Sequence, residues 1–385
     1  MSGKRDPARE LHVRQAAYLR GQYNLSQSEI GRILGGFSQA HVSRLLKLAE
    51  RRGYLVTTVR FVGEGIPAAD LAALRRLHES PPLALALEAL ERRDGSPMPR
   101  VHVFDSGSRA DSAMAQTWRR RRFGRAAAGR LHELLREVES VGIAWGSTVA
   151  GLIEGLAKLR TTVRSERPLT IVPVCAEILG LASPEYSSTR LSIRLGEVVA
   201  RPLVDTFSLS GVPAYLPRSL GEEKSAVIRD FVSDSDSYRA IFGTPDPLIE
   251  RLDGLITSIS STGRPVGGDC EELLRAGGID ADTLQSLIVG DIGGALLPRA
   301  SLTPDRCRLL DELNRMWTGV SLDHMATITH RARTSGRGIG CVVVAVGRER
   351  AAVAYEVLRR GLASEMLVDH DLAAELERLI RQHLG

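Results

Sequence analysis

The side chains best suited to recognise a partner lie on one predicted helix that begins after Ser38. Four apolar residues recur on it at helical spacing and define a buried face: Val42, Leu45, Leu46 and Ala49. The opposite face is polar, so the helix can enter the major groove of DNA, where Gln39 can pair with adenine and Arg44 with guanine or a phosphate. Hydroxyl and amine groups on this face are expected at phosphates. The predicted DNA-contacting set is Ser26, Gln27, Ser38, Gln39, His41, Ser43, Arg44 and Lys47.

A second group of chemically suited residues is Gly146-Ser147-Thr148, which lies between a predicted strand over 141–144 and a predicted helix over 149–159. Glycine lets a ligand approach the backbone closely, and the free N–H groups of a helix start form an anion site together with the two hydroxyls. The alternative is that the serine and threonine only cap the helix. The spacing alone does not decide between these interpretations.

Arg350 follows a further predicted strand, over 341–346, in the sequence Gly347-Arg348-Glu349-Arg350. A guanidinium at this position can clamp a phosphate with two parallel hydrogen bonds. Taken by itself, the loop favours a simpler interpretation, in which Arg350 is a surface residue in the first turn of a helix.

The predicted DNA-contacting helix is the third of three. The first spans about 7–22, and the second begins with a capping box in which Ser26 and Glu29 each bond the other's backbone N–H. The residues of the second helix expected to be buried are Ile30, Ile33 and Leu34. A run of β-branched residues over 54–62 predicts a strand that forms a wing. We therefore predict a winged helix-turn-helix DNA-binding domain over 1–62; a three-helix module that binds protein is the alternative.

The charge distribution favours DNA as the partner of this first segment. The chain has a net charge of +5, but residues 1–60 alone hold 11 Lys/Arg against 4 Asp/Glu, and the remainder holds 40 against 42. A phosphate-binding module requires such a local excess of positive charge. The basic residues interleave with a regular apolar pattern, which a disordered basic tail would lack.

The rest of the chain is predicted to be α/β. Residues 63–99 are expected to form a helical linker whose leucine and alanine faces suit self-association. Beyond residue 100, short apolar strands alternate with helices, which is typical of a mainly parallel, Rossmann-like sheet covered by helices. The predicted strands span 101–104, 141–144, 169–174, 255–259, 341–346 and 366–368. Such sheets bind ligands at the carboxyl ends of their strands, so 100–385 is predicted to bind a small ligand there.

Several other functions find no support in the sequence. The four cysteines are scattered and are expected to be reduced thiols, and no residues show the spacing of a metal site or of a nucleophile with its base. We predict no catalytic residue, no metal and no cofactor. Without an apolar run of membrane-spanning length or a signal-peptide pattern, we expect a cytoplasmic protein that does not enter the membrane. The basic run Arg119-Arg120-Arg121-Arg122 is interpreted as a solvated helix face.

Five stretches of the chain resemble the SorC/DeoR-type sugar-binding transcriptional regulators of bacteria. They are LSQSEIGRIL, SQAHVSRLLKLAERRGYL, VGIAWGSTVAGL, LIVGDIGGALL and VVVAVGRERAAVAYEVLRRGLASEMLVD. The resemblance implies a helix-turn-helix followed by an effector domain with a fold like that of phosphosugar isomerases. It also implies a phosphorylated sugar as ligand and assembly into dimers or tetramers, so that 100–385 would be the effector-binding and oligomerisation domain.

Carried over by position, the family's phosphate-binding loop corresponds to Gly146, Ser147 and Thr148, and a "GD" phrase corresponds to Gly290-Asp291. The family's late lysine corresponds to Arg350. The chain departs from the family pattern in two more places. Ser258-Ile259-Ser260 stands where a "GIG" phrase is expected, and the turn Gly35-Gly36-Phe37 is one residue longer. The resemblance thus implies the ligand-binding set Gly146, Ser147, Thr148, Asp291 and Arg350.

These observations predict a DNA-binding transcriptional regulator that binds double-stranded operator DNA as a homodimer or homotetramer. A phosphorylated sugar or a related metabolite is expected to modulate its operator affinity. Two alternatives stay open. One is a phosphosugar isomerase-like enzyme with an attached DNA-binding module, and the other is a ligand-independent DNA-binding factor.

Overall fold

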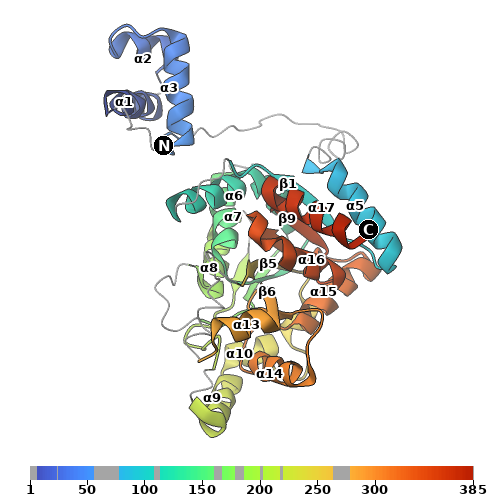
Figure 1. Cartoon of the computed structure of the whole chain (residues 1–385). Helices are drawn as coiled ribbons and strands as arrows, with labels where there is room; N and C mark the ends of the chain where they lie inside the picture. The colour runs from blue at the N-terminus through green and yellow to red at the C-terminus, as the bar shows by residue number, and fades with distance from the viewer. Residues whose placement is uncertain are drawn as a thin grey trace. The chain divides into compact units, whose positions relative to one another are not determined.

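The computed structural model describes residues 7–23, 25–55, 78–107, 113–159, 167–177, 186–199, 203–216, 220–262 and 278–384. The chain divides into two compact units, Met1–Glu64 and Gly65–Gly385 (Figure 1). Each unit has its own hydrophobic core, so the two are described separately.

The first unit contains three helices, α1 (Pro7–Tyr23), α2 (Gln27–Ile33) and α3 (Gln39–Arg51). Their apolar faces form one small core, with the following residues buried: Val13, Ala16, Ala17, Ile30, Val42, Leu45, Leu46, Ala49 and Leu55. The helical spacing of α3 predicts its buried face correctly. The predicted wing falls on residues 54–62, of which 56–62 lie outside the described residues.

One prediction for the first unit is wrong. Ile33, expected in the buried face of α2, is 57% exposed, whereas Ile30 is fully buried. Helix α2 ends at Ile33, and the chain then turns through Gly35 and Gly36, both with positive φ. Ile30 and Leu34, four residues apart, pack against the core, whereas Ile33 lies on the exposed flank of the helix.

The second unit is built on a parallel sheet in the order β1-β9-β8-β5-β2-β3-β4. This confirms the predicted α/β class. The strands are β1 (Arg100–Phe104), β2 (Ser140–Ile143), β3 (Leu169–Pro173), β4 (Val204–Thr206), β5 (Gly254–Ser261), β8 (Gly340–Ala345) and β9 (Glu365–Asp369). All six predicted strands are present within one or two residues. A hairpin of β6 (Ile288–Ile292) and β7 (Ala295–Pro298), which the sequence analysis did not predict, extends β5 in antiparallel fashion.

Helices cover both faces of the sheet. The described helices of this unit are α5 (Pro81–Asp94), α6 (Ala113–Arg136), α7 (Ser147–Lys158), α8 (Ser188–Val198), α9 (Gly221–Asp234), α10 (Asp236–Phe242), α11 (Leu248–Arg251), α13 (Ala281–Leu287), α14 (Pro304–Arg315), α15 (Leu322–Ser335), α16 (Ala351–Arg359) and α17 (His370–Leu384), and several of them form the two covering layers. Strand residues alternate between two cores. In β8, Val343 packs with the core that includes α5, α15, α16 and α17, while Val342 and Val344 pack with the core of α6, α7 and α8.

Helix α5 falls within the range predicted as a linker, yet its apolar face belongs to the second unit. Leu83 and Leu90 are buried, and α5 packs against α17. Arg93 adds a hydrogen bond to the carbonyl of His383 at 2.6 Å. These leucines are therefore occupied within the chain and are not available for the predicted self-association.

The topology sets where a ligand can bind. Strand β5 lies between β8 and β2, and the chain leaves β2 toward β3 on one side and β8 toward β9 on the other. In open parallel sheets such a reversal opens a crevice at the carboxyl ends of the central strands. The segments that follow β2, β5 and β8 are therefore brought to one edge.

Candidate functional site

The polar face of α3 carries most of the predicted DNA-contacting residues. Gln39, Arg44 and Lys47 are exposed, while His41 and Ser43 are half-buried. The His41 ring packs against Phe37, with centroids 4.5 Å apart, so this side chain is held against the turn before α3. The exposed amide, guanidinium and amine are thus the groups of this helix best able to reach a base or a phosphate.

The two predicted serine caps are present, and they fix the ends of α2 and α3. Ser26 Oγ accepts from the N–H of Glu29 at 3.3 Å, and the Glu29 carboxylate accepts from the N–H of Ser26 at 2.7 Å, which confirms the capping box. Ser38 Oγ accepts from the N–H of His41 at 3.3 Å. Gln27, in the first turn of α2, is half-buried. Both serines remain exposed beside the polar face of α3.

The orientation of α3 also depends on contacts that sequence reasoning missed. Glu10 of α1 forms an ion pair with Arg52 and accepts a hydrogen bond of 2.7 Å from Tyr54 Oη. Arg14 donates to the same phenol oxygen at 3.2 Å. These partners lie about forty residues apart in the chain, so no local pattern signals them.

The Gly146–Thr148 segment forms the start of α7. The helix begins at Ser147 with Gly146 at its N-cap, and no side chain caps it. The interpretation of Ser147 and Thr148 as capping residues is therefore wrong. Within the described residues, no hydrogen bond involves either hydroxyl. The first N–H groups of a helix have no intrahelical partner, so this end of α7 can bind an anion.

Position 146 requires glycine, because of its backbone conformation and its close neighbour on β5. Its φ is +133°, and a Cβ built on it would lie 2.3 Å from Ser258 Oγ on β5. Ser258 Oγ donates to the carbonyl of Trp145 at 3.1 Å. The absence of a side chain at position 146 thus lets the β2 loop lie directly against the end of β5.

Asp291 lies on β6, opposite Ser260 of β5 in the ladder. The Ser260 hydroxyl donates to its carboxylate, and the N–H of Gly294 donates to Oδ1 at 3.0 Å. The residue is only 6% exposed. This carboxylate therefore holds the β6–β7 turn against β5.

Arg350 lies at the third strand end, after β8. Its Nε donates to the carbonyl of Ile259 at 3.1 Å and its Nη1 to the carbonyl of Val346 at 2.5 Å. The guanidinium also forms an ion pair with Glu349, and the Arg350 side chain is only 12% exposed. The interpretation of Arg350 as a surface arginine is therefore wrong, because the side chain links two strand ends.

The predicted ligand-binding residues thus meet at three consecutive residues of β5. Gly146 contacts Ser258, Arg350 contacts Ile259, and Asp291 contacts Ser260. We call this group, together with Ser147 and Thr148, the strand-end cluster. The serines that replace the expected "GIG" phrase supply two of its internal hydrogen bonds.

An aromatic pair borders the strand-end cluster and was not predicted. Trp145 and Trp317 have ring centroids 5.1 Å apart, and Trp317 Nε1 donates to the carbonyl of Val320 at 2.9 Å. A Cβ at Gly294 would lie 2.1 Å from the Trp317 ring. The two tryptophans were not recognisable as a pair, because Trp317 is far from Trp145 in sequence.

The thiol of Cys175, beside the β6–β7 turn, is not activated. Cys175 is fully buried, and its Sγ contacts the carbonyl of Gly293 at 3.1 Å. Burial raises the pKa of Cys175 to about 12, so the thiol is neutral at physiological pH. Cys341 and Cys307 are free, and Cys270 lies outside the described residues.

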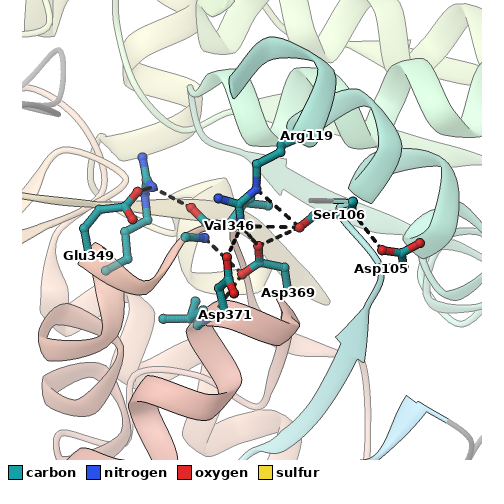
Figure 2. A network of polar contacts seen from close by, with 11 residues as sticks. Asp105, Ser106, Arg119, Val346, Glu349, Asp369 and Asp371 are labelled. Carbon is teal, nitrogen blue, oxygen red and sulfur yellow. Dashed lines mark hydrogen bonds and ion pairs between the residues drawn. The ribbon is translucent and has the colours of Figure 1, made fainter. Parts of the chain in front are cut away.

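The arginine run of α6 makes ion pairs within the chain. Arg119, with a side chain 15% exposed, contacts Asp369 at 2.5 Å and Asp371 at 2.8 Å (Figure 2). Arg121 pairs with Glu154 at 3.2 Å. Arg119 therefore does not lie on a solvated helix face, and that interpretation is wrong for this residue.

Asp369 is the centre of this network and is completely buried. Oδ2 accepts from Ser106 Oγ at 2.8 Å in addition to Arg119, while Oδ1 accepts from the N–H groups of Gly347 and Leu372 at 3.0 and 3.1 Å. Figure 2 shows the side chains of Arg119 and Ser106 converging on it from different elements. The network thereby fixes the loop that carries Arg350.

Metal sites and membrane-spanning helices are assessed for the described residues only. No three His, Cys, Asp or Glu side chains there lie close enough together to hold a metal ion. No helix there has the length and hydropathy needed to cross a membrane.

Comparison with known proteins identifies the fold. The chain is 17% identical to the full-length sorbitol operon regulator SorC from Klebsiella pneumoniae, with a TM-score of 0.55 over 97% of this chain and 100% of that chain. It is 17% identical to a probable sor operon regulator from Shigella flexneri, with a TM-score of 0.53 over 76% of this chain and 98% of that chain. For a domain of a possible sugar-binding transcriptional regulator from Arthrobacter aurescens TC1, the identity is 18% and the TM-score 0.52, over 76% of this chain and 97% of that chain.

No family model and no curated protein matches the sequence. The structural matches confirm the resemblance to SorC-type regulators at the level of the fold. The match to the full-length regulator spans nearly the whole chain.

Proposed function

We propose that this chain is a DNA-binding transcriptional regulator whose operator affinity is set by a small sugar-type effector. The observation that carries the proposal is the combination of a three-helix unit with a polar, exposed α3 face and a parallel sheet whose predicted ligand-binding residues meet at one edge. The likeness to a full-length regulator of a sorbitol operon supports it. We find nothing among the described residues of the strand-end cluster that favours the isomerase alternative.

In this proposal the effector is a phosphorylated sugar bound at the strand-end cluster. Its phosphate accepts from the first N–H groups of α7 and from the hydroxyls of Ser147 and Thr148. Two or four copies of the chain bind a symmetric operator in the cytoplasm through α3. Effector binding changes operator affinity through a coupling free energy of about 1–3 kcal/mol, which corresponds to roughly 5- to 150-fold.

The proposal is tested by isolating the operator first and the effector second. Genomic fragments bound by the full chain are selected and footprinted, and operator affinity is then measured with a panel of sugars and sugar phosphates. A protected, two-fold symmetric sequence whose affinity changes with one panel member is the expected result. If the folded protein protects no sequence, the proposal is wrong; if turnover of a sugar phosphate is found, the enzyme alternative is favoured.

Replacing Thr148 by valine is expected to abolish the effector response while leaving operator affinity unchanged. The substitution keeps the shape of a side chain that is 5% exposed and removes only the hydroxyl offered to the phosphate. The measurement is operator affinity with and without the effector found above. Thr329→Val is the matched control, because Thr329 is also buried but bonds the carbonyl of Leu362. If Thr148→Val retains the full response, the hydroxyl is not part of the effector site.

Replacing Arg44 by alanine is expected to weaken operator binding by more than about 1 kcal/mol, since a bidentate contact to a base contributes at least this much. Binding is measured by fluorescence anisotropy with a labelled operator. Arg51→Ala, at an exposed position in the last turn of the same helix, is the control. Unchanged affinity in Arg44→Ala would remove this residue from the interface.

A further inference from the structure

Arg350, the cation of the strand-end cluster, already forms an ion pair with a carboxylate of the chain, that of Glu349. The ion pair joins the Glu349 carboxylate to Arg350 Nη1. The Glu349 side chain is 38% exposed, against 12% for Arg350. The carboxylate therefore lies on the solvent side of the guanidinium.

Arg350 and Glu349 differ in the number of contacts that fix each side chain. Arg350 is fixed by the carbonyls of Ile259 and Val346, and both contacts are independent of Glu349. The loop itself is fixed through the Gly347 N–H, which donates to buried Asp369 at 3.0 Å. The only hydrogen-bonding partner of the Glu349 carboxylate among the described residues is Arg350. Glu349 can consequently leave while the guanidinium stays in place.

Gly347 makes room for this carboxylate. Its φ is +106°, and a Cβ built on it would lie 2.4 and 2.5 Å from the two Glu349 oxygens. The carboxylate thus occupies the space directly above the loop backbone, beside the guanidinium. An anionic group of a ligand that bonds Arg350 Nη1 from the solvent side would need the same space.

We infer that Glu349 is an internal anion that occupies Arg350 in the effector-free protein and must be displaced by the anionic group of the effector. The inference rests on the proposed function, because it concerns the same cluster. It makes Glu349 a specificity-determining residue. An anion that binds here must compensate for the broken ion pair between Glu349 and Arg350, so weakly binding anions are rejected. A neutral sugar does not need to displace the Glu349 carboxylate.

The test uses Glu349→Gln in the full chain, with inorganic phosphate and glucose 6-phosphate as anionic probes and glucose as the neutral probe. Affinities are measured by isothermal titration calorimetry. The variant removes the competing charge, so it is expected to bind the anions about 1.5- to 5-fold more tightly, the range for a partly exposed ion pair, and to bind glucose as the wild type does. Glu375→Gln is the matched control, because Glu375 also pairs with an arginine, Arg378, but on α17.

A double-mutant cycle separates competition from a general loosening of the loop. The gain in anion affinity is expected to vanish when Arg350→Gln is added, since no cation is then released. Equal anion affinities for wild type and Glu349→Gln would overturn the inference, as would equal gains for phosphate and for glucose. In the first case the proposed function stands if Thr148→Val still abolishes anion binding. If no variant binds either anion, both the inference and the proposed anionic effector are wrong.

Discussion

Asp369→Ala is expected to lower the free energy of unfolding of the second unit by about 3–5 kcal/mol. This is the usual cost of removing one partner of a buried ion pair, since the other charge is left unpaired. In this protein the effect is compounded, because the same carboxylate accepts from Ser106 and from two backbone N–H groups. Among the described residues, Arg119 would retain Ser106 Oγ as a hydrogen-bond acceptor and Asp371, whose side chain is 25% exposed, as its one ion-pair partner.

The measurement is urea unfolding followed by tryptophan fluorescence. All three tryptophans of the chain, Trp118, Trp145 and Trp317, lie in the second unit, so the signal does not include unfolding of the first unit. Asp371→Ala is the matched control and is expected to cost about 1 kcal/mol or less, as for other partly exposed ion pairs. Equal costs for the two variants would contradict the central role assigned to Asp369.

Operator affinity is expected to fall by about three orders of magnitude between 50 and 200 mM salt, if two DNA-binding units together neutralise about six phosphates. The physical reason is counterion release, which makes the logarithm of the binding constant fall linearly with the logarithm of salt concentration. The first 60 residues carry 11 basic against 4 acidic side chains, and several of the basic groups are exposed around α3.

The salt slope also tests individual side chains. Lys47→Ala is expected to reduce the slope by about one for each phosphate that the variant no longer neutralises, and to weaken binding evenly across operator variants. Lys158→Ala serves as the control, because Lys158 lies in the second unit and pairs with Glu154 at 2.6 Å. A flat salt response of the unsubstituted protein would contradict the assignment of α3 as the DNA-contacting helix.

Patterns local in sequence predicted the elements well. The i, i+3, i+4 spacing of apolar residues indicated the buried face of α3, and the Ser26–Glu29 spacing indicated the capping box. The six apolar runs of the second unit are six of the strands of its parallel sheet. The wrong predictions also come from patterns that are local in sequence. Ile33 has a spacing compatible with burial, but Ile30 and Leu34 make the core contacts and Ile33 lies on the exposed flank of α2.

The candidate site was predicted only in part. The sequence placed Gly146 and Arg350 at strand ends, but it left open whether Ser147 capped α7. The loop of Arg350, taken by itself, favoured a surface position, and only the family resemblance placed this residue in the ligand-binding set. It did not connect Arg119 with Asp369, which lies 250 residues away. It offered no sign that Trp145 and Trp317 are neighbours.

What the sequence determined by itself is the set of helices and strands, the basic character of the first unit and the position of candidate residues at strand ends. These depend on side-chain periodicity and charge, which a chain carries before it folds. The pairing of side chains was decided only by the tertiary structure: the strand order places β5 between β2 and β8 and so brings Gly146, Arg350 and Asp291 to one segment. The pairing of Arg119 with Asp369, for example, depends on the distance between elements remote in sequence. Burial of Asp369 then makes this ion pair necessary, because leaving a buried charge unpaired is too costly.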